Sequence, residues 1–381
     1  MNYKPIIKFI QDLYKTKDFI PLHAPVLSGN EKAYVSQTID TNFVSSVGGF
    51  VNEFEKNIEE FTGSTRAVAT VNGTAALHAA LTVAGVKQDD LVITQALSFV
   101  ATANSILYSG AKPVFVDVSN ESMGLCPKAL KEYLDEFGLQ KDDGTYHTKT
   151  KQRIKAILPM HTFGHPVELD ELVSIAKKWN LVLIEDAAES LGSFYKGRHT
   201  GTIGDYGTLS FNGNKIVTTG GGGAVLCDSQ DSGDRLKHIT TTAKVPHDYE
   251  FFHDDLGFNY RMPNINAALG CAQLEKINSF LRQKRKIAER YKDFFSETDF
   301  QFFEEPKYAK SNYWLNAVLC PDMKSREKFL EETNSMGVMT RPIWTLLDKL
   351  PMFSNSLKGD LPVSRKFELH IINLPSSPID I

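Results

Sequence analysis

Three segments combine polar, charged and glycine residues in a way that could support chemistry, and each stands at the end of a strand-like run. The first is Asn72-Gly73-Thr74, between RAVATV and an alanine-rich helical segment. In open parallel sheets, ligands bind at the carboxyl ends of the strands. The free N–H groups and the dipole at a helix N-terminus favour a phosphate there. An ordinary helix cap, with Asn72 or Thr74 as the capping residue, is the plain alternative.

Asp186 ends a second apolar run, LVLIE. A carboxylate at the end of a buried strand costs free energy unless a cation or hydrogen-bond donors pair with it. Three roles fit this position: a satisfied helix cap, a magnesium ligand, or the partner of a cofactor's protonated ring nitrogen. Asp186 by itself does not decide between them.

The third segment is SFNGNKIVTTGGGGAVL, in which Lys215 follows a strand ending at Ser210 and an Asn-Gly turn. The glycines Gly220 to Gly223 indicate an unusual backbone, because each glycine raises the entropic cost of folding. A hairpin turn with a solvated lysine is the plain alternative. The spacing G-x-x-x-x-G-K-[ST] of a P-loop is absent.

Taken in chain order, the three segments match one known combination. Pyridoxal phosphate requires a phosphate cradle, a carboxylate facing its pyridinium nitrogen, and a lysine that forms a Schiff base with its aldehyde. Here the phosphate turn comes first, Asp186 follows, and Lys215 comes last. The joint pattern is far more specific than its parts and predicts a pyridoxal phosphate site.

The elements that must position these residues alternate between about residues 65 and 226. Helical patterns separate short, uniformly apolar runs, which predict a mostly parallel sheet covered on both faces and joined by right-handed crossovers. We therefore expect a three-layer α/β large domain over residues 1–250. The expected strands are RAVATV, LVIT, PVFVDV, IKAILP and LVLIED.

The pattern changes after residue 250. A long helical pattern over 264–296, a strand-like run over 314–319 and a helix near 324–336 predict a smaller α+β domain over 251–381, attached through the long helix. The polar segment 138–153 is expected to be an exposed insertion.

Composition excludes several other classes of protein. The 381 residues contain 42 Lys+Arg and 46 Asp+Glu, a net charge of −4, so no basic surface supports binding to nucleic acid. The four cysteines form no CxxC pair, which excludes a disulfide scaffold and a cysteine-rich zinc module. Neither a signal-peptide run nor about 18 consecutive apolar residues occurs, so we expect a cytoplasmic protein with no membrane partner.

Further motifs stand in a characteristic order: NGTAAL, SFVATANSI, PVFVDV, HTFGHPVELD, IEDAAESLGS, SFNGNKIVTTGGGG and GFNYRMPNINAALGCAQL. With them, residues 20 to 377 resemble the sugar aminotransferases of the DegT/DnrJ/EryC1/StrS family, which have the type I aspartate-aminotransferase fold. The opening FIPLHAPVLSGNEKAYVSQTIDTNFVSSVG, together with FNGNK, is most similar to the branch acting in legionaminic acid and bacillosamine pathways.

The resemblance implies a role for each matching residue in holding the cofactor. Lys215 would bind the aldehyde of pyridoxal phosphate as a Schiff base, and Asp186 would face the pyridinium nitrogen. Gly73, Thr74 and Ser210 would hold the phosphate.

The resemblance also implies roles around the cofactor ring. Phe99 would stack on the ring, and Asn259 would reach the phosphate from the neighbouring subunit, which implies a homodimer with shared active sites. Glu189 would lie near the phenolic oxygen, where many members carry Gln or His. A carboxylate beside a phenolate is repelled unless it is protonated or offset by a donor.

His161 and His165 are four residues apart, a spacing that on a helix suggests paired metal ligands. Gly164 and Pro166 argue against a helix there. We therefore expect packing or substrate contact from the two histidines, and no metal.

The implied reaction is the transfer of an amino group from L-glutamate to a nucleotide-linked keto sugar. The expected acceptor is a UDP-linked 4-keto-6-deoxy-2-acetamido hexose, and the product a UDP-4-amino sugar for a surface glycan or a nonulosonic acid. The alternatives are GDP-4-keto-6-deoxymannose or a 3-keto sugar as acceptor, and a non-catalytic regulator that binds pyridoxal phosphate or a sugar nucleotide. A related sugar dehydratase would carry histidine in place of Lys215.

Overall fold

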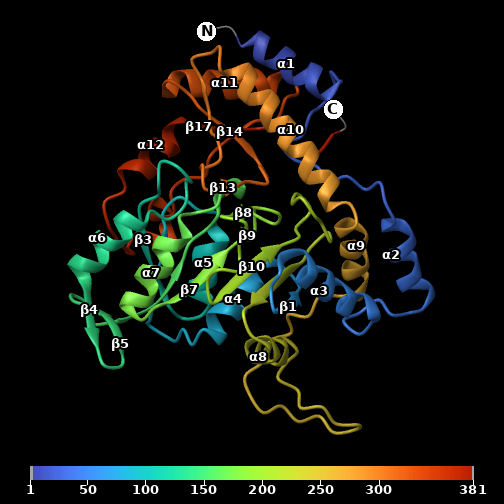
Figure 1. Ribbon diagram of the computed structural model, residues 1–381, viewed down its shortest axis with the longest axis vertical. Helices are drawn as coiled ribbons and strands as arrows, with labels where there is room; N and C mark the ends of the chain where they lie inside the picture. The colour runs from blue at the N-terminus through green and yellow to red at the C-terminus, as the bar shows by residue number, and fades with distance from the viewer. Residues whose placement is uncertain (1–2, 380–381) are drawn as a thin grey trace.

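The computed structural model describes residues 3–379, and a mixed ten-stranded sheet forms its centre (Figure 1). The strand order is β1-β11-β10-β7-β6-β2-β3-β16, and every neighbouring pair from β10 to β16 is parallel. Only β11 in this path runs antiparallel to its neighbours, β1 and β10. The predicted mostly parallel α/β sheet is confirmed. The strands of the path are β1 Arg66–Thr70, β2 Leu91–Gln95, β3 Lys112–Val116, β6 Arg153–Leu158, β7 Val182–Asp186, β10 Tyr206–Ser210, β11 Gly223–Cys227 and β16 Leu357–Lys358.

Helices cover both faces of this sheet, because successive strand residues point to opposite sides. On β1, Val68 packs with helices α4, α5 and α8, whereas Ala67 and Ala69 pack with α3 and α9. Helices α6 and α7 cover the second face nearer β2 and β3. The predicted three layers are therefore present. The helices are α3 Gly49–Thr62, α4 Gly73–Val83, α5 Val100–Tyr108, α6 Pro127–Phe137, α7 Leu169–Trp179, α8 Gln230–Thr240 and α9 Asn264–Leu274.

A smaller unit is built on a four-stranded antiparallel sheet in the order β12-β14-β17-β15. The expected strand over 314–319 is β14, and the expected helix near 324–336 is α11. Its elements are α10 Ile277–Phe295, β12 Gln301–Phe302, β14 Asn316–Leu319, α11 Met323–Ser335, β15 Arg341–Pro342, α12 Pro362–His370 and β17 Ile371–Leu374.

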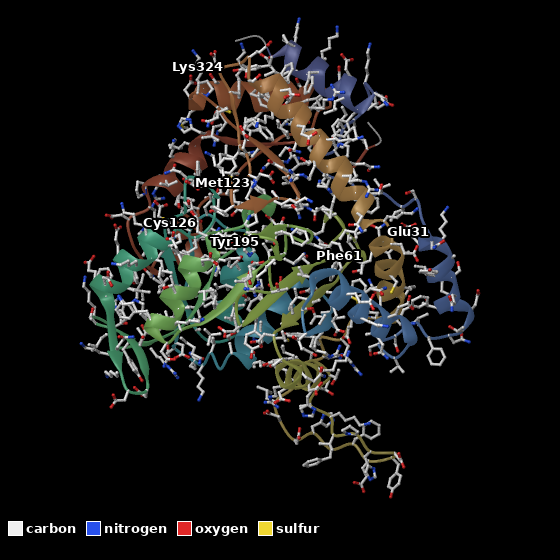
Figure 2. All side chains as sticks on the ribbon, in the orientation of Figure 1. Glu31, Phe61, Met123, Cys126, Tyr195 and Lys324 are labelled. Atoms are coloured by element: carbon white, nitrogen blue, oxygen red, sulfur yellow. The ribbon has the colours of Figure 1, made fainter. Side chains whose placement is uncertain are left out.

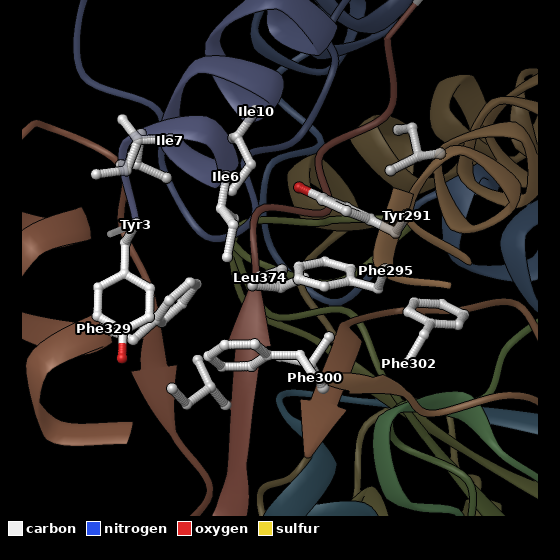
Figure 3. Close-up of a cluster of buried hydrophobic side chains, with 14 of the residues drawn as sticks. Tyr3, Ile6, Ile7, Ile10, Tyr291, Phe295, Phe300, Phe302, Phe329 and Leu374 are labelled. Atoms are coloured by element: carbon white, nitrogen blue, oxygen red, sulfur yellow. The ribbon is translucent and has the colours of Figure 1, made fainter. Parts of the chain in front are cut away.

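Helix α1 (Lys4–Tyr14) departs from the division expected at residue 250. Although it is N-terminal, its apolar face of Ile6, Ile7 and Ile10 packs into the core of the small domain, against Tyr291 and Phe295 (Figure 3). An amphipathic helix must bury its apolar stripe, and the C-terminal sheet supplies the cover. Strand β16 departs in the opposite sense, because it returns from the C-terminal part to the edge of the large sheet at β3.

The helical pattern over 264–296 forms two helices rather than one. Helix α9 packs against α2 (Glu31–Asp40) and α3, while α10 lies in the core of the small domain. The buried carboxylate of Glu31, labelled in Figure 2, accepts a hydrogen bond of 2.7 Å from Gln273 and ties α2 to α9. The break between α9 and α10 is thus where the chain passes from one core to the other.

The segment 138–153, expected to be an exposed insertion, forms an ordered hairpin. Strands β4 (Gly138–Lys141) and β5 (Gly144–His147) pair with each other, and β5 pairs with β6. Three shorter strands, β8 (Phe194–Tyr195), β9 (Arg198–His199) and β13 (Ala309–Lys310), form a separate sheet. Every helix within residues 3–379 is too short or too polar to span a lipid bilayer.

Candidate active site

A cavity of about 820 Å³ lies between the carboxyl ends of β1, β7 and β10 and the small-domain sheet. Its large-domain wall includes Asn72, Gly73, Thr74, Asp186, Glu189, Ser210 and Lys215. Its small-domain wall includes His23, Trp314, Arg341, Trp344 and Asn373. The sequence-predicted phosphate turn, carboxylate and lysine therefore meet in one cavity, as expected for strand ends in an open sheet.

The phosphate turn joins β1 to α4. Asn72 caps the helix, since its Oδ1 accepts the Ala75 N–H at 2.8 Å. The amides of Gly73 and Thr74 are the first of the helix and have no acceptor within it. Gly73 also approaches Ser210 so closely that a Cβ at position 73 would lie 2.9 Å from the Ser210 Cβ. The helix-cap and phosphate interpretations are thus compatible, because the Asn72 cap leaves these two amides for a ligand.

The backbone surroundings differ among the four glycines that follow Lys215. Gly220 has a φ of +76°, which disfavours other residues. Gly223 pairs with Ser210 and would place a Cβ 2.5 Å from the Asn72 carbonyl oxygen. Gly221 has open space around it. At Gly222 a Cβ would collide with Thr219 Oγ1. Three of the four positions therefore favour glycine, one because of its backbone conformation and two because of close contacts.

Asp186 ends β7 with its side chain buried in the cavity wall. Thr102 donates its hydroxyl to Oδ2 at 2.7 Å, and the Ala188 N–H donates to Oδ1 at 3.2 Å. Burial raises the pKa of the Asp186 carboxyl, and the two donors oppose that shift. The carboxyl is thus held in one orientation, ready for a cationic N–H partner.

Lys215 reaches the cavity beside Glu189 and Trp314. Its Nζ lies 3.3 Å from Glu189 Oε1 and 3.8 Å from the centre of the Trp314 ring. The other carboxylate oxygen of Glu189 accepts the Phe163 N–H at 2.9 Å. Burial raises the pKa of Glu189 to about 7, and the positive charge of Lys215 opposes the rise. Near neutral pH the carboxyl is therefore partly protonated, which relieves the repulsion expected between a carboxylate and a phenolate.

Comparison with known proteins places these residues in a family. Residues 25–379 match the DegT/DnrJ/EryC1/StrS aminotransferase family. The GDP-perosamine synthase of Escherichia coli O157:H7 is 36% identical over 360 residues, 94% of each chain. The putative pyridoxal phosphate-dependent aminotransferase EpsN of Bacillus subtilis (strain 168) is 36% identical over 339 residues, 89% of this chain and 84% of its own. The solved structure of the aminotransferase TlmJ from Streptoalloteichus hindustanus has a TM-score of 0.85 and 25% identity, covering 94% of this chain and 93% of TlmJ.

The chain belongs to the DegT/DnrJ/EryC1/StrS aminotransferase family. It is accordingly a pyridoxal phosphate-dependent sugar aminotransferase with the type I fold, as the sequence motifs predicted. The likeness to the legionaminic acid and bacillosamine branch stays a prediction.

The residues of this family member fit pyridoxal phosphate. Gly73, Thr74 and Ser210 form a close turn with free amides for a phosphate, and Asp186 presents a buried carboxyl for a ring nitrogen. Lys215 provides an amine in the same cavity for the aldehyde. Phe99, the residue before α5, also lines the cavity, 6.2 Å from Trp344 between ring centres. Their individual roles toward the cofactor stay predictions.

Three other predicted site residues lie outside the lining of this cavity. His161 is buried, with Nε2 3.0 Å from Glu185 Oε2 and Nδ1 accepting the Val167 N–H at 3.2 Å. His165 is buried among aromatic rings, including those of Phe303 and Tyr313. Asn259 is exposed and accepts hydrogen bonds from Arg261. The geometry therefore favours packing for the histidines, and it leaves Asn259 facing outward.

Sequence reasoning did not find the small-domain wall. Trp314 begins the predicted strand-like run but gave no sign of contact with Lys215. Arg341 and Trp344 share the segment RPIW, in which a cation and an aromatic residue near a proline are a weak signal of a site. His23 and Asn373 stand in segments with no such signal, and only long-range pairing brings them to the cavity.

Proposed function

We propose that this enzyme transfers the amino group of L-glutamate to a nucleotide-linked 4-keto-6-deoxyhexose, forming a 4-amino sugar for a surface glycan. The observation that carries the proposal is the meeting of Lys215, Asp186 and the Gly73 turn in one cavity large enough for a sugar. Pyridoxal phosphate, when bound, accepts the electron pair released at the donor's α-carbon. The cytoplasm is the proposed setting.

The side chains of the large-domain wall divide the work of proton transfer. Lys215 Nζ removes the proton from the α-carbon of the donor and later delivers a proton to the sugar carbon that receives the amine. Asp186 keeps the proton on the ring nitrogen, because its buried carboxylate is stabilised by a cation. Glu189 accepts a hydrogen bond from the Lys215 amine when that amine is not joined to the cofactor.

The proposed acceptor is GDP-linked, for instance GDP-4-keto-6-deoxymannose. The likeness to the E. coli GDP-perosamine synthase supports this acceptor over other nucleotide sugars. A UDP-linked 4-keto-6-deoxy-2-acetamido hexose is the second candidate. It is favoured by the opening segment 19–48, whose His23 lines the cavity.

A substrate panel tests the proposal. Purified enzyme loaded with pyridoxal phosphate is given L-glutamate, and the visible absorption band of the cofactor should fall. The band should return on addition of a keto sugar, and kcat/KM for the GDP- and UDP-linked sugars ranks the two acceptors. A band that does not fall when L-glutamate is added, or that returns with none of the keto sugars, would contradict the proposal.

The enzyme works as a homodimer in which Asn259 serves the partner's site. Asn259 bridges to Thr241 at the end of α8, and the loop between them projects beyond α8 (Figure 1). Exposed Tyr249, Phe251 and Leu256 lie on that loop. Exposed apolar side chains gathered on one segment support a protein interface. Inactive Lys215→Ala and Asn259→Ala enzymes should regain activity on subunit mixing, because each hybrid dimer contains one intact site. Activity that fails to return in hybrids of confirmed composition would contradict the arrangement.

A further inference from the structure

His23, Arg341 and Asn373 form a patch of polar groups on the small-domain wall. Arg341 on β15 lies directly opposite Asn373 on β17, and directly opposite residues of antiparallel strands point to the same face. The segment of His23 runs alongside, since the Ser376 N–H donates to the Leu22 carbonyl at 2.7 Å and Ile20 bridges to Val338. Three segments far apart in the sequence thus contribute polar residues to the lining of the same cavity.

Two members of this patch are buried without hydrogen-bond partners in the described part of the chain. His23 is 9% exposed and both its ring nitrogens are unpaired. Asn373 is 3% exposed and its Nδ2 is unpaired. An unmade hydrogen bond leaves a buried donor with its full desolvation cost. Two such groups in the lining of one cavity indicate a ligand that accepts hydrogen bonds from the His23 N–H and from Asn373 Nδ2.

The third member contributes a positive charge. Arg341 donates to Asn334 Oδ1 and to the Thr340 carbonyl, each at 3.1 Å, which orients the guanidinium. Across residues 3–379 it takes part in no ion pair, unlike Arg285, which binds Glu305 through both terminal nitrogens. Burial lowers the pKa of His23 well below its usual range, so its imidazole is neutral. The patch therefore offers one cation and two neutral hydrogen-bonding groups.

We propose that His23, Arg341 and Asn373 form a carboxylate subsite that holds the amino donor beside Lys215. A single cation with neutral donors suits a singly charged carboxylate, and the planar fork of arginine matches its two oxygens. A diphosphate carries more charge than the patch offsets. The proposal rests on the proposed function, in which an amino acid and a nucleotide sugar use the same cavity in turn.

Binding of an unreactive dicarboxylate tests the subsite without turnover. Glutarate lacks the amino group, so calorimetry with the loaded enzyme measures recognition of the carboxylates alone. Arg341→Gln should weaken glutarate binding roughly 10- to 100-fold and leave binding of GDP and UDP within about twofold. Arg341→Lys keeps the charge but loses the planar fork, so its affinity for glutarate should lie between those of wild type and Arg341→Gln. The control Arg198→Gln changes an arginine that donates to the Thr202 carbonyl away from the cavity, and should change neither affinity.

Asn373→Leu separates a binding role from a structural one. Replacing an unpaired buried amide by an apolar group of similar size should leave the melting temperature unchanged or raise it. The same variant should weaken glutarate binding. A lower melting temperature with unchanged glutarate affinity would assign Asn373 to structure and overturn its part in the subsite.

The remaining outcomes distinguish failure of the carboxylate subsite from failure of the proposed function. If Arg341→Gln weakens the binding of GDP or UDP but not that of glutarate, the patch binds the diphosphate and the carboxylate proposal is wrong. If it weakens neither, there is no anion subsite. Either result leaves the proposed function standing as long as wild-type enzyme aminates a keto sugar with L-glutamate. Absence of that activity in wild-type enzyme would instead contradict the proposed function.

Discussion

The two walls of the cavity differ in how their polar groups are paired. On the large-domain wall, the carboxyl groups of Asp186 and Glu189 each have protein partners on both oxygens. On the small-domain wall, His23 and Asn373 keep buried nitrogens without partners. Carboxyl groups that the protein already holds in place suit a resident cofactor, and buried nitrogens without partners suit ligands that bind and leave. Substitutions in the large-domain wall should therefore slow both half-reactions. Substitutions in the small-domain wall should weaken the binding of one substrate.

The largest effect is expected from Asp186→Asn. The amide keeps the shape and the contact with Thr102 but cannot stabilise a protonated ring nitrogen, so kcat should fall roughly 100- to 1000-fold with either substrate limiting. Single-turnover absorbance measurements of each half-reaction check this. Asp205→Asn is the matched control, since Asp205 accepts the Leu183 N–H on the same strand outside the cavity. A loss confined to one half-reaction would break the contrast between the walls.

The sequence revealed the large-domain wall because its chemistry is local. Asp186 and Ser210 end apolar strands, Lys215 follows one of those ends closely, and parallel topology brings such ends together. The small-domain wall has no local signal. Its residues stand in segments around 23, 341 and 373 that meet only through the pairing of β15 with β17 and the bridge at Ile20.

The same reason explains which parts of the fold were predicted. The five strands expected between residues 66 and 186 lie where their apolar runs predicted, as β1, β2, β3, β6 and β7, whereas α6 and the hairpin of β4 and β5 were not predicted. The packing of α1 on the small domain and the break between α9 and α10 depend on which core accepts each apolar face. Nothing in the periodicity of either segment specifies that choice.

A smaller effect is expected at Thr102, which acts on the site through Asp186. Thr102→Val removes the 2.7 Å hydrogen bond, so kcat should fall about tenfold while KM for both substrates stays nearly unchanged. Thr102→Ser keeps the hydroxyl and should restore most of the rate. A rise in KM for one substrate alone would show that Thr102 acts on binding rather than on the orientation of Asp186.

The smallest effect concerns stability and Glu189. Its pKa in the folded state, about 7, lies above the ordinary value of 4.5, so the folded protein binds more protons than the unfolded protein between those pH values. The contribution of Glu189 to stability is therefore fully present below pH 4.5 and is lost as the pH rises through 7. The free energy of unfolding of the cofactor-free protein, measured with urea at pH 5 and pH 8, should fall with pH by up to about 3 kcal/mol more than in Glu189→Gln. The exposed Glu53→Gln control should follow wild type, and parallel pH dependence of all three proteins would contradict the assignment.

The central claim is that the Lys215 amine holds the cofactor aldehyde in the same cavity as Asp186. Borohydride reduction of the loaded enzyme, followed by peptide mass spectrometry, tests it most directly. We expect the reduced cofactor on the peptide that contains Lys215, and no stable label in Lys215→Ala treated in the same way. A label on another lysine of the wild-type enzyme, or no label at all, would contradict the account.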